Sequence, residues 1–277
     1  MNVVKLALAR GMHVPVIRKC WSTVTGLPLM ETSLHNIARR LFPLEQRIWV
    51  RIRYKEFNQG SFWLSVEPRY EDGHYLGIHE VAVQKFFVSH LKPGDCFYDV
   101  GAHTGFFSIL AAALVGKRGS VIALEPDRRN AALLREAIAR NSLGSITDTV
   151  EQAVWSFEGN IRLLSANPGP HSNTGMSKIV PANVPDSYEV PCTSLDKLSR
   201  GRPAPTLIKI DVEGAESEVL KGAHKLFESS RPSLLCEIHD ETNATFVQFW
   251  LAQREYAFRW LEQAEGFPRH LVASPRG

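Results

Sequence analysis

The first regular pattern of hydrophobic and polar positions predicts a β-hairpin. Residues 47–54 alternate between polar and apolar side chains, and residues 61–66 do so again. This period of two is typical of β-strands, because successive side chains of a strand point to opposite faces. The turn sequence at 58–60, Asn-Gln-Gly, separates the two runs and favours a hairpin. Residues 80–91 then carry apolar side chains at helical spacing, which predicts a helix.

From residue 95 onwards, strand and helix patterns alternate. Such alternation predicts a parallel sheet covered by helices on both faces. We therefore expect an α/β fold with a doubly wound, mostly parallel sheet, preceded by an N-terminal helical and β-hairpin extension. The predicted strands lie near residues 95–100, 119–125, 147–154, 205–211 and 232–239, and the predicted helices near 104–115, 127–141, 215–227 and 242–254.

Two stretches depart from this alternation. Residues 165–191 are rich in Asn, Pro, Ser and Gly and show no periodicity, which predicts a long loop. Long loops inside compact domains are commonly functional. Near the C-terminus, residues 270–273 predict a short strand at the edge of the sheet.

The most informative stretch is residues 97–105. An apolar strand ends in Asp99, and Gly101 and Gly105 follow before an apolar helix begins. Glycine lets the backbone turn sharply and approach a ligand closely, and the helix N-terminus offers unpaired N–H groups to an anion. Asp99 can accept a hydrogen bond from an ammonium or hydroxyl group. The stretch therefore predicts a site for a nucleotide-like ligand.

The spacing of the glycines narrows the choice of ligand. A dinucleotide site requires G-x-G-x-x-G, whereas this chain has acid-x-G-x-x-x-G. A second strand ends in Glu125, about 20 residues after Gly101, where an acid can accept hydrogen bonds from ribose hydroxyls. An NAD-linked oxidoreductase remains an alternative, disfavoured by the missing glycine. A catalytically inert cofactor-binding module is a second alternative.

Together these motifs resemble the FkbM family of S-adenosylmethionine-dependent methyltransferases. The likeness covers roughly residues 75–240, and His103, which replaces the middle glycine of the common S-adenosylmethionine motif, is not a departure from this family. The resemblance implies a Rossmann-like class I methyltransferase fold, S-adenosylmethionine as cofactor, and a small-molecule or glycan acceptor. The expected acceptor atom is a hydroxyl oxygen of a sugar, glycolipid or secondary metabolite. The matching runs are residues 99–105, 125–127, 207–216, 219–223 and 235–239.

The resemblance also implies a set of cofactor-binding residues and a division of the chain. We expect an N-terminal extension over residues 1–74, a methyltransferase domain over 75–265 and a C-terminal tail over 266–277. The predicted cofactor-binding residues are Asp99, Gly101, Ala102, His103, Gly105, Glu125, Pro126 and Ala153.

Charged residues in two predicted central strands are unusual, because such strands are normally apolar throughout. Lys209 and Asp211 share one side of their strand, and Glu237 and His239 share one side of theirs. The two strands are neighbours in the usual methyltransferase sheet. We therefore predict that Lys209 and Glu237 form an ion pair, since an unpaired buried charge is costly. Asp211 and His239 should then lie together at the carboxyl edge, where ligands bind.

Methyl transfer to a hydroxyl requires alignment of the reactants and removal of a proton. His239 is the expected base, because its ordinary pKa is near neutrality. Asp211 would orient it, and Glu213 could face the acceptor. We expect no metal, although Asp211, Glu237, His239 and Asp240 offer oxygen and nitrogen ligands to a divalent ion.

Composition excludes several other classes of protein. The net charge of +3 is small and no basic block stands out, so we expect no nucleic-acid partner. Four scattered cysteines without C-x-x-C indicate neither a thiolate zinc site nor a disulfide framework, which favours a cytoplasmic location. No run approaches the roughly 20 apolar residues of a membrane span. Residues 1–21 are interrupted by charges and lack the apolar core of a signal peptide.

Overall fold

The computed structural model describes residues 47–67, 71–165, 177–181, 183–263 and 265–276. The expectation for residues 1–21 therefore lies outside the described residues. The chain divides into two compact units, one comprising residues 1–85 and 168–175 and the other residues 86–167 and 176–277. The boundary between the two units falls inside helix α5 (Val81–His90). The presence of α5 confirms the helix predicted over residues 80–91.

In the first unit, the predicted hairpin is confirmed. Strands β1 (Ile48–Ile52) and β2 (Phe62–Val66) pair in antiparallel register. A short helix follows, α4 (Asp72–Leu76), and it ends at Gly77 in the left-handed conformation with φ 72°. The guanidinium of Arg47 pairs with Glu71 at 2.9 Å, which ties the start of β1 to the start of α4.

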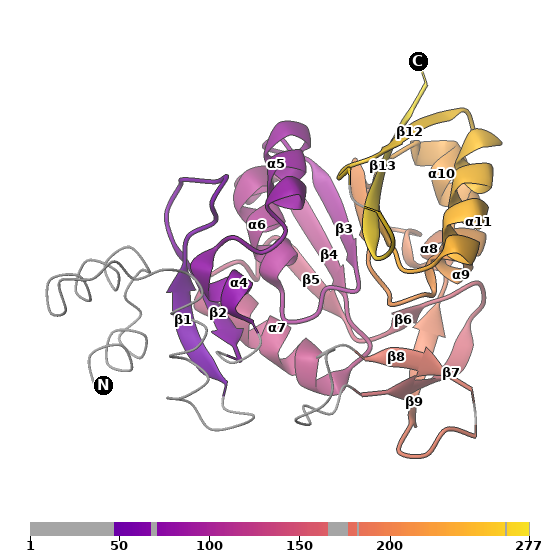
Figure 1. Cartoon of the computed structure of the whole chain (residues 1–277). Coiled ribbons are helices and arrows are strands. Elements are labelled where there is room, and N and C mark those ends of the chain that lie inside the picture. The colour runs from indigo at the N-terminus through magenta and orange to yellow at the C-terminus, as the bar shows by residue number, and fades with distance from the viewer. Residues whose placement is uncertain (1–46, 68–70, 166–176, 182, 264, 277) are drawn as a thin grey trace, which may run out of the picture. The chain divides into compact units, whose positions relative to one another are not determined.

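The second unit contains a seven-stranded sheet in the order β12-β13-β11-β10-β3-β4-β5 (Figure 1). The five strands from β11 to β5 are parallel, whereas β13 runs antiparallel to both of its neighbours. The predicted doubly wound, mostly parallel sheet is confirmed. The strands are β3 (Cys96–Val100), β4 (Ser120–Leu124), β5 (Thr147–Val150), β10 (Leu207–Ile210), β11 (Ser233–Ile238), β12 (Tyr256–Trp260) and β13 (Arg269–Pro275).

The C-terminal part of the sheet differs from the prediction. The strand predicted at 270–273 exists, but it lies between β11 and β12 rather than at the edge. The edge strand is β12, which follows α11 along the chain and was not predicted. Its burial pattern explains the omission, because only Tyr256 is buried while the rest of the strand is exposed or half-buried. Residues 269–275 are thus part of the sheet and not a separate tail.

Helices connect the parallel strands, as predicted. The helix expected over 215–227 is divided in two, because the chain passes very close to Trp155 at Gly222. A Cβ atom at Gly222 would lie 2.3 Å from the carbonyl oxygen of Trp155. The helices of this unit after α5 are α6 (Phe106–Val115), the 3₁₀ helix η1 (Gly116–Arg118), α7 (Arg128–Arg140), α8 (Leu195–Leu198), α9 (Glu216–Lys221), α10 (His224–Ser230) and α11 (Glu241–Ala252).

The two faces of the sheet carry different side chains. Tyr98, Ile208 and Cys236 belong to the large core cluster that also contains residues of α8, α9, α10 and α11. Their neighbours along each strand must therefore point to the opposite face. That face packs against α6, where Phe97 and Phe107 are both buried and the Lys209 ammonium lies 5.3 Å from the Phe107 ring. The charged residues of the central strands consequently lie on the α6 side.

A second, four-stranded sheet has the order β6-β9-β7-β8. It corrects the long loop predicted over 165–191, because β8 and most of β9 lie within that stretch, while residues 166–176 and 182 are outside the described residues. The predicted strand 147–154 is likewise divided between β5 and β6. Pro, Ser and Asn are frequent in this stretch and interrupt the alternation of polar and apolar side chains, so the sequence pattern does not predict these short strands. The strands are β6 (Ala153–Val154), β7 (Gly159–Leu164), β8 (Lys178–Val180) and β9 (Tyr188–Thr193).

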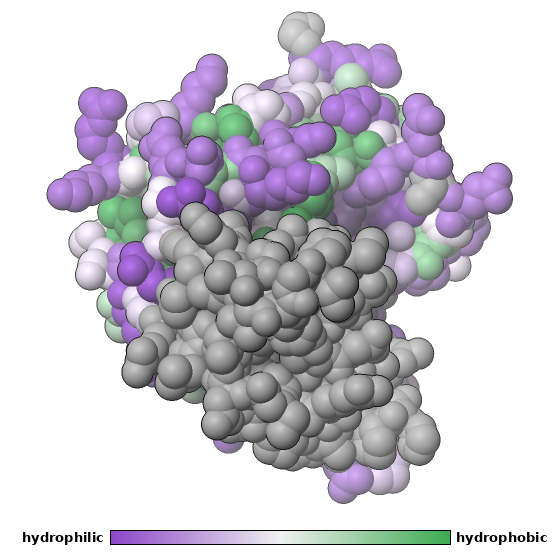
Figure 2. Space-filling view, turned by 60° about the vertical axis from the view of Figure 1, so that its left-hand side comes forward, coloured by the Kyte–Doolittle hydropathy of each residue, from purple (hydrophilic) through white to green (hydrophobic). Residues whose placement is uncertain are grey.

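The surface shown in Figure 2 is mostly hydrophilic outside the grey atoms, with hydrophobic residues in small groups. Among the described residues, no helix is long and apolar enough to cross a membrane. The large hydrophobic side chains that are exposed are dispersed along the sequence, at Val88, Phe157, Phe249 and Phe258.

Replacing Gly101 by alanine should strongly destabilise the second unit. Gly101 has φ 85°, and an added Cβ would lie 1.8 Å from the carbonyl oxygen of Asp211, so β3 and β10 could not keep their spacing. We expect a loss of about 3 kcal/mol or more in the free energy of unfolding. Gly144→Ala is the control, because no atom lies within 4 Å of a Cβ there. Equal effects of both substitutions in denaturant unfolding would contradict this account.

Candidate active site

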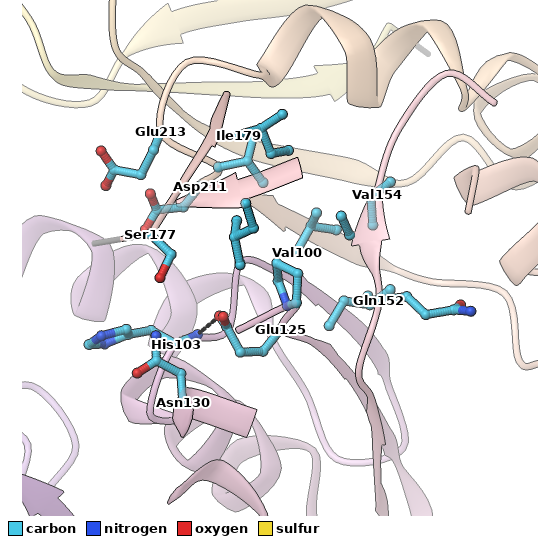
Figure 3. A pocket seen from close by; sticks show the side chains of 16 residues that line it. Val100, His103, Glu125, Asn130, Gln152, Val154, Ser177, Ile179, Asp211 and Glu213 are labelled. Atoms are coloured by element: carbon cyan, nitrogen blue, oxygen red, sulfur yellow. Dashed lines mark hydrogen bonds between the residues drawn. The ribbon is translucent and has the colours of Figure 1, made fainter. Parts of the chain in front are cut away.

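A pocket opens where strands β3, β4 and β10 end, at the carboxyl edge of the sheet (Figure 3). Its volume is about 630 Å³, including its open mouth. Ligands of open α/β sheets bind at this edge. Its polar lining comes mainly from three strand ends: His103 from the turn after β3, Glu125 after β4, and Asp211 and Glu213 after β10.

Glu125 is held in a fixed orientation by two backbone N–H groups. Its Oε2 accepts from the backbone N–H of His103 at 2.8 Å, which is drawn in Figure 3, and its Oε1 accepts from that of Asp127 at 2.9 Å. Burial raises the pKa of Glu125 to about 7, against the lowering effect of these hydrogen bonds. Each carboxylate oxygen has further acceptor capacity, so Glu125 can also receive two hydroxyl groups from a ligand.

The turn between β3 and α6 adopts backbone conformations that suit a closely approaching ligand. Gly101, His103 and Gly105 all have positive φ, at 85°, 50° and 97°. A Cβ at Gly105 would lie 2.6 Å from Cδ1 of Leu134. Gly101 is needed for the packing of the turn against the backbone after β10, whereas Gly105 is favoured by its positive φ, because the Leu134 side chain can move. Gly101 and His103 also line the pocket.

Not all of the predicted cofactor-binding residues line this pocket. Gly101, His103, Glu125, Pro126 and Ala153 do so, whereas Asp99, Ala102 and Gly105 are not among its lining residues. Asp99 is completely buried, and its Oδ2 accepts from the hydroxyl of Ser108 on α6 at 2.5 Å. Asp99 therefore has a structural contact beneath the turn, and its predicted acceptance from a ligand group stays a prediction.

The pocket also contains residues outside the predicted cofactor-binding set. Asn130 comes from α7, and Ser177 and Ile179 come from the second sheet. The Ser177 hydroxyl donates to Oδ2 of Asp127 at 2.8 Å. Burial alone would raise the pKa of Asp127, but hydrogen bonds, first of all from the hydroxyls of Ser165 and Ser177, lower it below its usual value. Contacts between segments far apart in the sequence bring these residues to the pocket, Asn130 from a helix and Ser177 and Ile179 from the segment around β8.

The predicted alignment of Lys209 with Glu237 is wrong by two residues, and their ion pair stays a prediction. Lys209 lies opposite Leu235 in the parallel pairing of β10 with β11, and Ile210 lies opposite Cys236. The Lys209 ammonium instead contacts Oδ2 of Asp211 on its own chain segment, at 2.7 Å. The Lys209 side chain is 2% exposed and that of Asp211 18%. The same register brings Asp211 beside Glu237, whereas the predicted neighbour of Asp211 is His239, two residues further along the chain.

His239 lies next to two glutamates. Its Nδ1 is 2.7 Å from Oε1 of Glu216, and its Nε2 is 3.6 Å from Oε2 of Glu213. Burial would lower the pKa of His239, but its contacts with the carboxylates of Glu213 and Glu216, together with their charges, outweigh burial and raise this pKa to about 10. His239 is also absent from the pocket lining, whereas Asp211 and Glu213 belong to it. These observations do not support His239 as a general base that takes a proton directly from an acceptor.

Comparisons with known proteins agree on the fold and the family. A family model described as "Methyltransferase FkbM domain" matches residues 99–260. The chain is 29% identical over 197 residues to 31-O-demethyl-FK506 methyltransferase FkbM of Streptomyces tacrolimicus, covering 60% of this chain and 74% of that protein.

Two solved structures resemble the chain. Methyltransferase FkbM from Methylobacillus flagellatus KT has a TM-score of 0.50 and 17% identity; the match covers 74% of this chain and 54% of that one, so this chain spans about half of its length. An S-adenosylmethionine-dependent O-methyltransferase from Thermotoga maritima has a TM-score of 0.47 and 12% identity, covering 84% of this chain and 78% of that one. At 17% identity the likeness to the Methylobacillus flagellatus structure concerns the fold alone.

Removing the charge of Lys209 should destabilise the protein much more than removing an exposed lysine. Lys209→Met leaves Asp211 without its 2.7 Å partner in a largely buried setting, at a cost of about 3 kcal/mol. Lys221→Met is the control, because the pair of Lys221 with Glu218 is partly exposed and contributes at most about 1 kcal/mol. Denaturant unfolding measures both. A double variant, Lys209→Met with Asp211→Asn, should be less destabilised than the sum of the single variants.

Proposed function

The chain belongs to the FkbM methyltransferase family, and on this premise we propose that it transfers a methyl group from S-adenosylmethionine to a hydroxyl oxygen of a small-molecule or glycan acceptor. The family consists of methyltransferases, so the NAD-linked alternative is set aside. The observation that supports the cofactor best is the carboxylate of Glu125, held by two backbone N–H groups at the rim of the pocket.

The pocket residues fit the parts of this cofactor. Glu125 would accept hydrogen bonds from the two ribose hydroxyls. Apolar walls suit the flat adenine ring, and Gly101 lets the backbone come close to the methionine portion. When bound, S-adenosylmethionine supplies an electrophilic methyl group on a positively charged sulfur. The apolar wall residues are Val100, Leu124, Val154, Leu163 and Ile179.

We assign acceptance of the acceptor's proton to Glu213. Its side chain is 9% exposed and lines the pocket, and its Oε1 has no hydrogen-bond donor in the described part of the chain. Asp211, the other carboxylate of this wall, is engaged by Lys209. In this assignment His239 is a positioning residue behind Glu213, and general-base catalysis contributes about 10²–10⁴ in rate.

Oxygen as the accepting atom agrees with one relative. The Streptomyces tacrolimicus protein is named for methylation of an oxygen atom. A carboxylate base also suits a hydroxyl group, whose proton must leave as the new bond forms. The chemistry of the wall thus favours a hydroxyl acceptor without selecting one compound.

Glu125→Ala should weaken the binding of S-adenosylhomocysteine. Two hydrogen bonds to a charged group are lost, which amounts to about 3 kcal/mol or a Kd roughly 100-fold higher. Isothermal titration calorimetry measures the Kd, and Glu136→Ala, which removes an exposed glutamate of α7, is the control. An unchanged Kd in a folded Glu125 variant would remove this residue from the cofactor site.

Glu213→Gln should slow methyl transfer by about 10²–10⁴ while leaving S-adenosylhomocysteine binding nearly unchanged. A labelled-methyl assay against a panel of sugar, glycolipid and polyketide hydroxyls first identifies an acceptor and then supplies the rate. Glu241→Gln, which removes an exposed glutamate of α11, should keep the wild-type rate. Wild-type turnover in the Glu213 variant would assign the proton to another group. Cofactor binding without transfer to any acceptor would favour the inert module.

A further inference from the structure

We propose that Asp211, Glu237 and His239 form a binding site for one divalent metal ion beside the pocket. The inference goes beyond the proposed methyl transfer, and it does not require bound S-adenosylmethionine. It rests on the way the ends of β10 and β11 bring the three residues together and on buried polar atoms around them that have no partner among the described residues.

The three side chains converge closely enough to share one ion. One ligand atom from each of Asp211, Glu237 and His239 lies within 4.8 Å of the others. Ligand atoms around an ion with bonds of about 2.2 Å are separated by no more than about 4.4 Å. Small side-chain rotations are therefore sufficient to close the site. Asp211 accepts from Lys209 through Oδ2, and a carboxylate can coordinate an ion through its second oxygen at the same time.

His239 is held in the manner of a metal-binding histidine. Its Nδ1 makes a 2.7 Å hydrogen bond with Oε1 of Glu216, whose side chain is completely buried. This contact occupies Nδ1 and leaves the other ring nitrogen, Nε2, to act as a ligand. A ligating histidine commonly donates its second ring N–H to a carboxylate in the same way. Nε2 is buried and has no hydrogen-bond partner among the described residues.

The surroundings of Glu213 are an independent indication that a cation can bind here. Its side chain is more than nine-tenths buried, and its Oε2 points to within 3.6 Å of Nε2 of His239, too far for a hydrogen bond. Its Oε1 has no donor in the described segments. A buried carboxylate oxygen without a donor is costly, and a cation in the neighbouring cluster would lower this cost through its charge.

The ligand set indicates the kind of ion. Two carboxylates and one imidazole combine oxygen ligands, which suit Mn²⁺ and Mg²⁺, with a nitrogen ligand, which suits first-row transition metals. Mn²⁺ satisfies both preferences. Asp211 also lines the pocket, so an ion held there would lie next to the acceptor. The ion could bind the acceptor hydroxyl and lower the pKa of that group. Only this consequence rests on the proposed function.

The test is Mn²⁺ binding to the whole chain after treatment with a chelator. Electron paramagnetic resonance measures the free ion during the titration. We expect saturation at one Mn²⁺ per chain, and Glu237→Gln and His239→Gln should each raise the Kd at least about 10-fold. Glu241→Gln removes the same charge from an exposed position nearby and should leave the Kd unchanged. Thermal unfolding of each variant checks that it remains folded.

A second variant tests the orientation of the imidazole. Glu216→Gln keeps the shape of the buried side chain but weakens its hold on His239, so Mn²⁺ affinity should fall by about 10–100-fold. Failure of the wild-type chain to bind Mn²⁺ below about 1 mM, or equal affinities of the wild-type and His239→Gln proteins, would overturn the proposal. S-adenosylhomocysteine binding is measured separately, so loss of the metal proposal and loss of the proposed function are distinguishable.

Discussion

The buried ammonium of Lys209 is the constraint on which the centre of this structure depends. Lys209 lies in β10, between β3 and β11, with only 2% of its side chain exposed. A buried charge must be compensated. Asp211, on the same face of the same segment, compensates it, since its Oδ2 lies 2.7 Å from Nζ of Lys209. Asp99 occupies the position beside Lys209 in β3. The requirement for compensation thus concentrates carboxylates at the carboxyl edge of the sheet, where the pocket opens.

The acidic wall and the cofactor turn are parts of one arrangement. The backbone of Gly101 approaches the carbonyl oxygen of Asp211 so closely that no Cβ fits between them. The backbone N–H of Asp211 also donates a hydrogen bond to the carbonyl oxygen of Val100 at 2.9 Å. The turn that would receive a cofactor and the strand end that would receive an acceptor are therefore fixed to each other. Methyl transfer requires such alignment, because its main demand on a protein is the relative position of the reactants.

Sequence patterns predicted the alternation of strands and helices in the parallel sheet and the turn after β3. The first depends on local periodicity and the second on glycine. They also predicted Glu125, whose distance from the turn is set by one strand–helix–strand unit. They did not predict which residue of β11 lies beside Lys209, because the pairing of β10 with β11 is displaced by two residues from the assumed alignment. A displacement of two keeps every side chain on its expected face, so alternation alone cannot detect it.

The sequence by itself determined the family, the doubly wound sheet and the residues that form its carboxyl edge, because these follow from motifs and periodicities within short segments. Only the tertiary structure decided which of those residues meet. It buried Asp99 against Ser108, brought Ser177 from the second sheet to the pocket, and set His239 behind Glu213 instead of in the lining. Each of these outcomes depends on contacts between segments far apart in the chain, and no local pattern specifies their register or the direction of a side chain at a strand end.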